Sequence, residues 1–368
     1  MLKGNQGEWS ELYVLLKLIS EGRVYGADKD LNQISDIYYD ILKMIRKQTD
    51  GVWEYERNIN INIYNQDTEE VIISVPIQEF RLNSELLINE MKNIKSRDGS
   101  FEVPKLSDFI SKIKVNTLKA KSIDKADISI KMHDGKTGSD PTLGFSIKSM
   151  LGSPSTLLNA GGTTNFLYEI TGNINDEIMN EVNSISKNRG AKVIPDLRKR
   201  FQYLQSNNTE IKFVDICNRT FKNNLILIDS SLPDICGWLL KEFYLKGISN
   251  CNENLESISK ANPLGYDIKN GQPFYHYKFK KLISESALGM LPGSIWSGLA
   301  DATGGYLIVK EDGEVLCYHL YNRNEFEDYL LENTRFETPS TSKYGFGTIY
   351  KEGMKYFIKM NMQIRFIK

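Results

Sequence analysis

Apolar residues recur along this chain in two rhythms, one typical of helices and one typical of strands. Trp9, Leu12, Leu16 and Ile19 recur at three- and four-residue spacing, which predicts a helix over Gly7 to Ile19. Spacing and composition predict further helices over 31–47, 84–93, 106–113, 164–171, 176–186, 196–205, 233–246 and 325–331. Strands are predicted within 55–76 and over 305–309, 315–321, 347–350 and 355–367.

The order of these elements predicts the fold class. Strands and helices do not alternate strictly, and neither an internal repeat nor a long linker separates them. The 368 residues are 40% hydrophobic and 11% aromatic, which is ample for a packed core. We therefore predict a mixed α/β (α+β) architecture that folds as one compact domain over residues 1–368.

Two polar triplets, Ala126-Asp127-Ile128 and Ser146-Ile147-Lys148, stand within segments that alternate apolar and polar residues. The stretch 133–141 between these segments is dense in turn residues, which predicts a β-hairpin. Antiparallel pairing about that turn sets Asp127 roughly opposite Lys148. A carboxylate and an ammonium at the mouth of a hairpin suit metal-dependent phosphodiester cleavage. The alternative is an exposed cross-strand ion pair, which stabilises a protein little.

The composition narrows the chemistry. The formal net charge of −1 neither requires nor excludes nucleic acid, because binding depends on local patches. The four cysteines form no CxxC pair, which argues against a zinc site or a disulfide framework. The three histidines do not cluster in the sequence, so serine-histidine catalysis is not expected. We expect chemistry based on carboxylates, lysine and a hard cation.

The amino-terminal segment bears on localisation. Met1 to Gln6 leads directly into a polar helix start, without the apolar core of a signal peptide. The apolar stretch from Leu12 to Ile19 is interrupted by Lys17 and is far too short to span a bilayer. We therefore expect a cytoplasmic protein with no membrane segment.

The same segment supplies a further carboxylate. Residues Lys3 to Glu11 fit the pattern KGxxGxxxE, in which two glycines permit close approach of the backbone. A carboxylate on a largely apolar helix is costly to bury unless it is paired or bound to a metal. The alternative is that Glu8 and Glu11 only favour the positive end of the helix dipole.

Taken together, these segments resemble the PD-(D/E)xK nuclease superfamily. The KGxxG helix is similar to that of MutH-like and Sau3AI-like enzymes. The sequence of the chain beyond this helix resembles HpaII-type restriction endonucleases more closely still. The segments that carry this resemblance are Lys3 to Glu11, Phe145 to Ser149, Thr156 to Gly161, Thr164 to Phe166 and the tail from Asp301 to Gly347.

The resemblance covers nearly the whole chain and implies a fold and an activity. It implies a central mixed β-sheet flanked by helices, with added strands in the C-terminal third. It also implies Mg²⁺-dependent double-strand cleavage of DNA at a short palindrome, which is CCGG for the namesake of the family. The catalytic core is then expected roughly over 1–175, and DNA-recognition elements roughly over 150–200 and 290–368.

The implied catalytic residues are Asp127, Lys148, Glu11 and Ser146. Asp127 and a second carboxylate would hold the metal, the Ile147 carbonyl could also reach it, and Lys148 would orient the attacking water. Ser146 departs from the superfamily, which usually has Asp or Glu there, and serine is a poorer ligand for a hard cation. The missing carboxylate is Glu11, ranked first on the KGxxG pattern, or Glu169 on the expected following helix.

Polar residues after Lys148 are the candidates for reading DNA. Side chains there could contact phosphates or base edges, although an ordinary Gly/Ser/Asn loop would have the same composition. The candidates are Thr156, Asn159, Thr164 and Asn165, joined by Arg323, Ser340 and Lys343 in the tail.

Several alternatives remain open at this point. The same fold could serve a MutH-like repair nickase, and Ser146 would also suit an inactive DNA-binding module. A palindromic target suits a homodimer, but a monomer that cuts the strands in turn is equally compatible. Double-stranded DNA is the expected partner, and a cognate DNA methyltransferase is expected in the same system without physical association.

Overall fold

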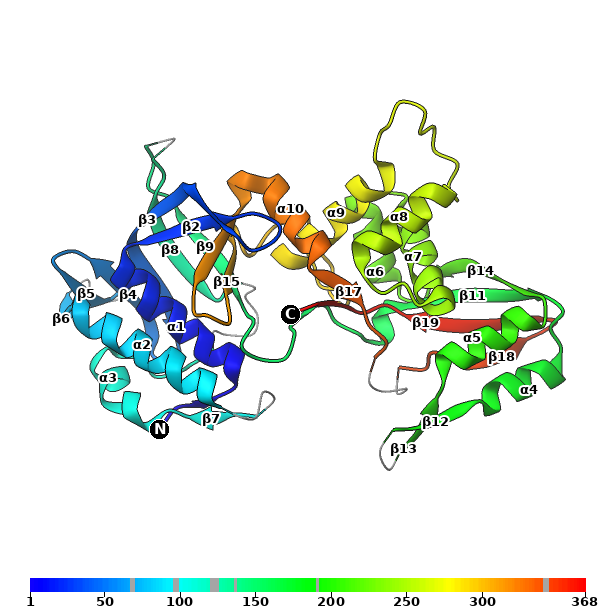
Figure 1. Ribbon diagram of the computed structural model, residues 1–368, viewed down its shortest axis with the longest axis horizontal. Coiled ribbons are helices and arrows are strands. Elements are labelled where there is room, and N and C mark those ends of the chain that lie inside the picture. The colour runs from blue at the N-terminus through cyan, green and yellow to red at the C-terminus, as the bar shows by residue number, and fades with distance from the viewer. Residues whose placement is uncertain (67–69, 95–98, 120–125, 136–137, 190–191, 340–343) are drawn as a thin grey trace. The chain divides into compact units, whose positions relative to one another are not determined.

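The computed structural model describes residues 1–66, 70–94, 99–119, 126–135, 138–189, 192–339 and 344–368. It has a mixed α/β architecture, which confirms the predicted fold class (Figure 1). Contacts divide the described residues into two compact units. Unit 1 contains Met1–Ser155, Ala300–Tyr329 and Lys368, and unit 2 contains Thr156–Leu299 and Leu330–Ile367. This division differs from the single domain predicted over 1–368, because the chain leaves unit 1 after Ser155 and returns to it at Ala300.

Unit 1 is built on a nine-stranded mixed sheet in the order β2-β16-β15-β9-β8-β3-β4-β5-β6. Strand β2 also pairs with β3, so six of the strands close into a ring. The strands are β2 (Arg23–Ala27), β3 (Gln33–Gln48), β4 (Gly51–Arg57), β5 (Asn60–Asn65), β6 (Val71–Pro76), β8 (Ile128–His133), β9 (Thr142–Ser149), β15 (Gly305–Val309) and β16 (Val315–His319). A separate pair joins β1 (Lys3–Gly4) to β7 (Phe101–Glu102).

Helix α1 (Gln6–Glu21) covers one face of this sheet and is the helix predicted from the apolar spacing. It begins at a capping box between Asn5 and Glu8 and ends at Gly22, whose φ of 75° is left-handed. Its apolar residues join one buried core with residues of β3, β8, β9 and β15. Helix α2 (Ile77–Asn93) lies beside α1 (Figure 1). The 3-10 turn η1 (Pro104–Leu106) and α3 (Ser107–Lys112) follow.

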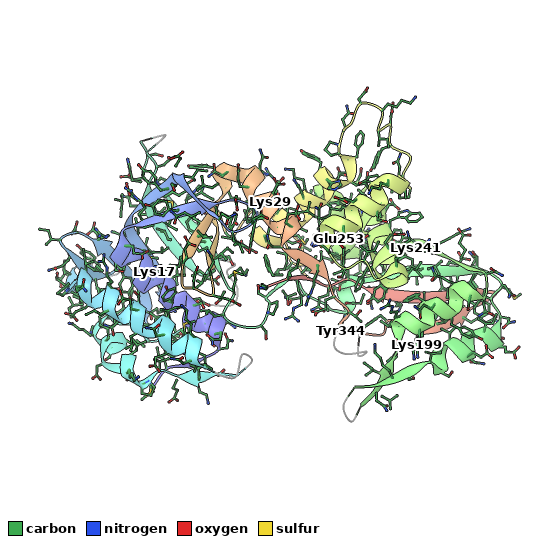
Figure 2. All side chains as sticks on the ribbon, viewed as in Figure 1. Lys17, Lys29, Lys199, Lys241, Glu253 and Tyr344 are labelled. Atoms are coloured by element: carbon green, nitrogen blue, oxygen red, sulfur yellow. The ribbon has the colours of Figure 1, made fainter. Side chains whose placement is uncertain are left out.

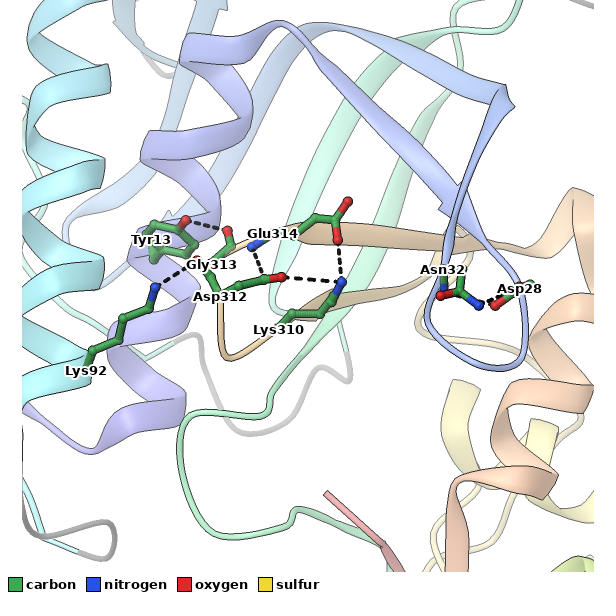
Figure 3. Close-up of polar contacts among 8 residues, drawn as sticks. All are labelled: Tyr13, Asp28, Asn32, Lys92, Lys310, Asp312, Gly313 and Glu314. Carbon is green, nitrogen blue, oxygen red and sulfur yellow. Dashed lines mark hydrogen bonds and ion pairs between the residues drawn. The ribbon is translucent and has the colours of Figure 1, made fainter.

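The turn between β15 and β16 belongs to Ala300–Tyr329, the segment in which the chain returns to unit 1. Hydrogen bonds join this turn to α1 and α2 (Figure 3). The Tyr13 hydroxyl donates to the Gly313 carbonyl at 2.5 Å, and Lys92 Nζ donates to the Asp312 carbonyl at 2.8 Å. Because Tyr13 and Gly313 are 300 positions apart, this contact ties the two ends of the sequence into one core.

The helix predicted over 31–47 is wrong, because this segment forms the long strand β3. Ile34, Ile37, Ile41 and Ile45 have helical spacing in the sequence. In the structure, the pairing of β3 with β8 shifts register between Ile41 and Lys43, which breaks the strand alternation. This register shift therefore gives the apolar residues of a strand the spacing that is typical of a helix.

Unit 2 combines sheets and helices. Its largest sheet has the order β14-β11-β19-β18, and a second has the order β10-β20-β17. The strands are β10 (Thr156–Leu158), β11 (Asn165–Gly172), β12 (Ser186–Arg189), β13 (Lys192–Pro195), β14 (Thr209–Ile216), β17 (Thr334–Phe336), β18 (Ile349–Glu352), β19 (Lys355–Asn361) and β20 (Ile364–Phe366). The helices are α4 (Asp176–Ser184), α5 (Leu197–Ser206), α6 (Arg219–Ile228), α7 (Leu232–Lys246), α8 (Cys251–Ala261) and α9 (Phe274–Leu288). Helix α10 (Arg323–Glu332) crosses the boundary between the units.

The helix predicted over 164–171 is also wrong, because residues Asn165–Gly172 form β11. This strand is central, with β14 on one side and β19 on the other. Phe166, Tyr168 and Ile170 are buried in alternation. A short apolar run of this kind cannot be told from a helix by periodicity alone. Among the helices in the described part of the chain, none combines the length and apolar character needed to cross a membrane.

Candidate active site

The two polar triplets lie at the mouth of a hairpin, as predicted, but in a different register. Strands β8 and β9 pair antiparallel with Ile128 opposite Phe145, and the Asp127 N–H donates to the Phe145 carbonyl at 2.8 Å. Asp127 therefore meets Ser146 and Ile147 rather than Lys148. The predicted pairing of Asp127 with Lys148 is two residues out of register, because the whole ladder from Ile128 opposite Phe145 to Lys131 opposite Thr142 has a different register, which places Asp127 beside Ser146.

One oxygen of the Asp127 carboxylate is tied to strand β9. Oδ2 accepts the Ile147 backbone N–H at 2.6 Å and the Ser146 hydroxyl at 3.2 Å. Ser146 is only 2% exposed, so its hydroxyl is held inside the protein. In this geometry Ser146 donates a hydrogen bond to Asp127. Because the N–H and C=O of one strand residue project to the same side, the Ile147 carbonyl also faces the Asp127 side of β9.

Lys148 is half-buried on β9, and its ammonium lies 5.2 Å from the ring centroid of Tyr306 on β15. Burial lowers the pKa of Lys148, and the negative charges of Asp127 and then Glu11 oppose that shift. Both candidate metal-binding carboxylates of unit 1 therefore act electrostatically on this ammonium.

The two glutamates of the KGxxGxxxE segment have separate roles. Glu8 completes the capping box of α1, because its Oε2 accepts the Asn5 N–H at 2.8 Å while the Asn5 side chain accepts the Glu8 N–H at 3.0 Å. Glu11 lies nearly one turn further along the helix, and its charge acts on Lys148. Glu8 therefore stabilises the start of the helix, as the alternative interpretation proposed. Glu11 instead interacts electrostatically with Lys148 of the hairpin.

Arg46 on β3 is a member of this group that the sequence pattern did not suggest. Its side chain is 1% exposed, and Glu11, Tyr55 and Asp127 all oppose the lowering of its pKa by burial. In the sequence, Arg46 stands among alternating lysines and apolar residues and resembles a solvated position. A buried arginine of this kind requires compensation by nearby negative charge.

Two pockets lie within unit 1 beside the hairpin. A pocket of about 340 Å³ adjoins Lys148 and is lined by Asn5, Gln6, Gly7, Ile147, Ser149, Gly152, Ser153 and Ser155. A second, of about 330 Å³, adjoins Asp127 and is lined by Ile45, Lys47, Ala126, Ile128, Ser129, Thr142, Gly144, Asp301 and Thr303. Both Asp301 and Lys47 face the Asp127 pocket without having been predicted, since they are remote from the hairpin in sequence.

The donor atoms near the hairpin suit a hard cation. Over the residues whose placement is described, no group of three His, Cys, Asp or Glu side chains gathers to hold a metal ion. The donors available in unit 1 are instead the carboxylates of Asp127 and Glu11 and the Ile147 carbonyl. Mg²⁺ commonly binds one or two carboxylates and completes its shell with water and substrate phosphate. The chemistry of the donors thus fits a divalent cation that shares its coordination with water and a phosphate group.

Glu169, the other candidate for the second carboxylate, lies in unit 2. It is on strand β11 rather than on the helix expected after Lys148. Its carboxylate is 3.1 Å from Lys355 Nζ on β19. The structure therefore gives Glu169 a cationic partner within its own unit, while Asp127, Lys148 and Glu11 share unit 1.

Two of the predicted DNA-contacting side chains are buried in unit 2. Asn165 accepts from Asn361 Nδ2 at 2.7 Å and donates to the Tyr344 carbonyl at 2.7 Å (Tyr344 is labelled in Figure 2). Thr164 is fully buried, and its hydroxyl is 3.2 Å from the Gly161 carbonyl. These polar groups hold the segment after β10 in place, and only Asn159 among the neighbouring candidates is exposed.

The remaining candidates differ in their surroundings. Thr156 is half-buried at the start of β10. Arg323 is exposed at the start of α10 and pairs with Glu327 at 2.7 Å. Ser340 and Lys343 lie outside the described residues.

Comparison with known proteins gives a consistent picture over the full length. The family model of the HpaII restriction endonuclease matches residues 5–366. The chain is 42% identical over 368 residues to the type II restriction enzyme HpaII of Haemophilus parainfluenzae, covering 99% of this chain and 98% of that protein. No solved structure matches the chain significantly.

Proposed function

The chain belongs to the HpaII restriction endonuclease family, and from this premise we propose that Asp127, Glu11 and Lys148 form its DNA-cleaving site. As a type II restriction endonuclease, the protein acts on double-stranded DNA, and enzymes of this family generally use a divalent metal. The proposal concerns which residues perform the cleavage, which metal they use and which sequence they cut.

One observation carries the assignment. The Asp127 carboxylate is fixed against β9 by the Ile147 N–H, and the next residue on that strand is Lys148. The charges of Asp127 and Glu11 both act on the Lys148 ammonium. A carboxylate on the hairpin, a carboxylate on α1 and a half-buried lysine therefore act on one another, and this set of residues suits metal-dependent phosphodiester hydrolysis.

Each residue has a defined part in the proposed reaction. Asp127, Glu11 and the Ile147 carbonyl would hold Mg²⁺, which supplies charge neutralisation at the phosphate and acidifies a bound water. Lys148 donates a hydrogen bond to the attacking water and offsets the charge that develops on the phosphate oxygens. Ser146 donates to Asp127 and keeps that carboxylate in its orientation. The water gives up a proton to solvent as its oxygen forms the new bond to phosphorus in line. The bond from phosphorus to the sugar oxygen breaks, and that oxygen takes up a proton from solvent.

The target that we propose is CCGG, because it is typical of the family. A palindrome presents two equivalent half-sites, so a two-fold dimer would cut both strands in one encounter. A companion methyltransferase of the same specificity would protect the host DNA without binding this protein. Light scattering with and without a duplex that contains CCGG tests the dimer directly.

The DNA-contacting surface of unit 2 is proposed to join the segment after β10 with the loop Leu291–Leu299. A methyl group built on Gly293 would contact Thr163 at 3.7 Å, so these two segments lie side by side. Buried Asn224 holds the loop by donating to the carbonyls of Leu291 at 3.2 Å and Ser294 at 2.9 Å. Ile295 on this fixed loop is 91% exposed. An exposed aliphatic residue on a held loop suits contact with base edges or base steps.

Plasmid digestion tests the proposal. With Mg²⁺, a plasmid that carries CCGG sites should give discrete linear fragments, and EDTA should abolish the cutting. Asp127→Ala and Lys148→Ala should each abolish cleavage while leaving DNA binding largely intact. Open circles would instead identify a nickase, and retarded but intact DNA an inactive binding module. Full activity in either variant would refute the site, and sequencing of the fragment ends gives the target and the cut position.

A further inference from the structure

Strands β12 and β13 and the first turn of α5 form a basic arm over residues 186–199 of unit 2. Within the described residues the two strands pair only with each other, from Ser186 opposite Pro195 to Arg189 opposite Lys192. The ribbon that they form extends away from α4 and α5 (Figure 1). A two-stranded ribbon is only marginally stable by itself in water, so the rest of the unit must hold its base.

Arg200 holds the base of this ribbon. Its side chain is 3% exposed, its Nε donates to the Ile185 carbonyl at 2.9 Å, and its Nη1 donates to the Gly347 carbonyl at 2.6 Å. The Asp196 N–H also donates to the Ile185 carbonyl, at 3.3 Å. The ribbon is therefore fixed to unit 2 at the end that joins α5.

The segment is strongly basic in a chain that is nearly neutral. Residues 186–200 contain six Lys and Arg and one Asp, a net charge of +5, whereas the whole chain has a formal net charge of −1. The carboxylate of Asp196 is 7% exposed, accepts the Lys199 N–H at 3.4 Å and lies 3.7 Å from Lys187 Nζ. This one carboxylate offsets only one of the positive charges.

Arg198 and Lys199 are exposed in the first turn of α5 (Lys199 is labelled in Figure 2). Positive charge at this end opposes the helix dipole, so these side chains do not stabilise the helix. Among the residues described in unit 2, none forms a hydrogen bond or an ion pair with either side chain. The two undescribed stretches of unit 2, 190–191 and 340–343, contain no acidic residue that could pair with them.

Helix α4 beside α5 carries three carboxylates, and two of them bind other residues. Glu181 accepts from the Tyr203 hydroxyl, and Asp176 lies 2.8 Å from Lys351 Nζ. Glu177 adds one more negative charge at the start of α4. The basic arm therefore presents positive charge that its surroundings in unit 2 do not cancel.

We infer that the basic arm binds the phosphate backbone of DNA. Lys and Arg side chains that neutralise phosphates release counterions, and the major groove, about 12 Å wide, admits a two-stranded ribbon. Since the protein acts on double-stranded DNA, the charge of the arm matches its substrate. This surface is separate in sequence from the segment after β10 and the loop Leu291–Leu299, and it does not depend on which residues cut.

The salt dependence of DNA binding tests this inference. Titrations in EDTA use a CCGG duplex and an equally long duplex without CCGG. A triple variant with Lys187→Gln, Arg198→Gln and Lys199→Gln should bind both duplexes about ten- to a hundredfold more weakly. The slope of log affinity against log salt should become shallower by about 2–3, because each phosphate contact contributes about 0.9. Because neither metal nor cleavage enters the measurement, a failure of the site at Asp127 would leave it unaffected.

A second triple variant removes the same charge elsewhere in unit 2. Lys246→Gln, Lys260→Gln and Lys269→Gln change exposed lysines of α7, α8 and the loop after α8, and should leave affinity and slope close to those of the unmodified protein. Equal losses in the two triple variants would overturn the inference. An unchanged slope in the first variant, or a loss confined to the CCGG duplex, would overturn it as well.

Thermal melting shows whether the first triple variant is folded. Its melting temperature should equal or exceed that of the unmodified protein, because α5 loses positive charge at the positive end of its dipole. If that variant does not fold, Lys199→Gln alone should make the slope shallower by about one. A folded Lys199→Gln variant with an unchanged slope would then overturn the inference.

Discussion

The backbone N–H of Ile147 donates a 2.6 Å hydrogen bond to Oδ2 of Asp127, so the strand that carries Lys148 also orients the carboxylate. The Ser146 hydroxyl reaches the same oxygen at 3.2 Å. Ser146 thus supports the orientation of Asp127 through its hydroxyl.

Substitution of Ser146 should show whether this residue orients Asp127 by a hydrogen bond or coordinates the metal itself. Ser146→Ala should lower the cleavage rate by about ten- to a hundredfold, because one hydrogen bond to a charged group contributes about 1.5–3 kcal/mol. Ser146→Asp should lower it further, since a second carboxylate would face Asp127 at hydrogen-bonding distance. Single-turnover cleavage rates measure both effects. A Ser146→Asp variant that cuts faster than the unmodified enzyme would show that this position coordinates the metal.

Glu8 and Glu11 on α1 provide a matched pair for the second carboxylate. Glu11→Gln should reduce cleavage by at least about a hundredfold while the protein keeps its thermal stability, because the metal loses a charged ligand. Glu8→Gln should lower the free energy of unfolding by less than about 1 kcal/mol and leave the cleavage rate unchanged, since Glu8 belongs to the capping box. Glu169→Gln on β11 completes the series. Loss of cutting in Glu169→Gln alone would transfer the ligand role to unit 2.

His319 should make the stability of unit 1 depend on pH. Burial lowers the pKa of His319 to about 4 from 6.5, and the charge of Asp134 opposes that shift only in part. The unfolded chain therefore binds the proton first as the pH falls. Stability is fully present above pH 6.5 and is lost as the pH falls through the window from 6.5 to about 4, by up to roughly 3 kcal/mol.

Denaturant unfolding at several pH values measures this dependence. His319→Asn keeps an acceptor for the Tyr321 N–H and should flatten the profile across the window. His133→Asn is the matched control, because His133 is exposed and pairs with Asp140 on the hairpin. If the two variants have the same pH profile, the buried imidazole is not the group that titrates.

Gly304 should be intolerant of a side chain, because a methyl group there would lie 2.4 Å from the ring of Phe145. Gly304→Ala is expected to destabilise unit 1 by about 1–3 kcal/mol, as overpacking of a core does. Because Phe145 precedes Ser146 on β9, cleavage should fall as well. Gly135→Ala is the control, since open space surrounds that position. Equal melting temperatures for the two variants would contradict the close packing.

Asn165 and Asn159 should respond differently to alanine. Asn165→Ala should lower the free energy of unfolding by roughly 1–3 kcal/mol, because buried groups of Asn361 and Tyr344 lose their partners. Asn159→Ala should leave stability unchanged and weaken binding to a CCGG duplex, since Asn159 is exposed on the proposed DNA-contacting surface. Thermal melts and DNA titrations distinguish the two. Unchanged DNA affinity in Asn159→Ala would remove that residue from the surface.

The sequence predicted the parts of the site that lie close together along the chain. The hairpin follows from the alternation around Asp127 and Lys148, and the α1 helix follows from the spacing after KGxxG. The register of the hairpin does not follow, because the composition of the turn segment 133–141 does not fix which residues pair across it. Arg46 was missed because burial of a lone arginine in a strand depends on what α1 covers, which no local pattern reports.

Strands β9 and β15 are neighbours in the sheet but are synthesised at very different times. On the ribosome, Asp127 and Lys148 are made long before Gly305–Val309, the strand β15 that lies beside β9 and supplies Tyr306 against Lys148. All of residues 156–299 must be synthesised first. A nascent chain therefore carries the proposed catalytic residues Asp127 and Lys148 on a sheet edge that lacks β15 until the last part of the protein is made. The proposed site gains Tyr306 as a neighbour only when synthesis is nearly finished.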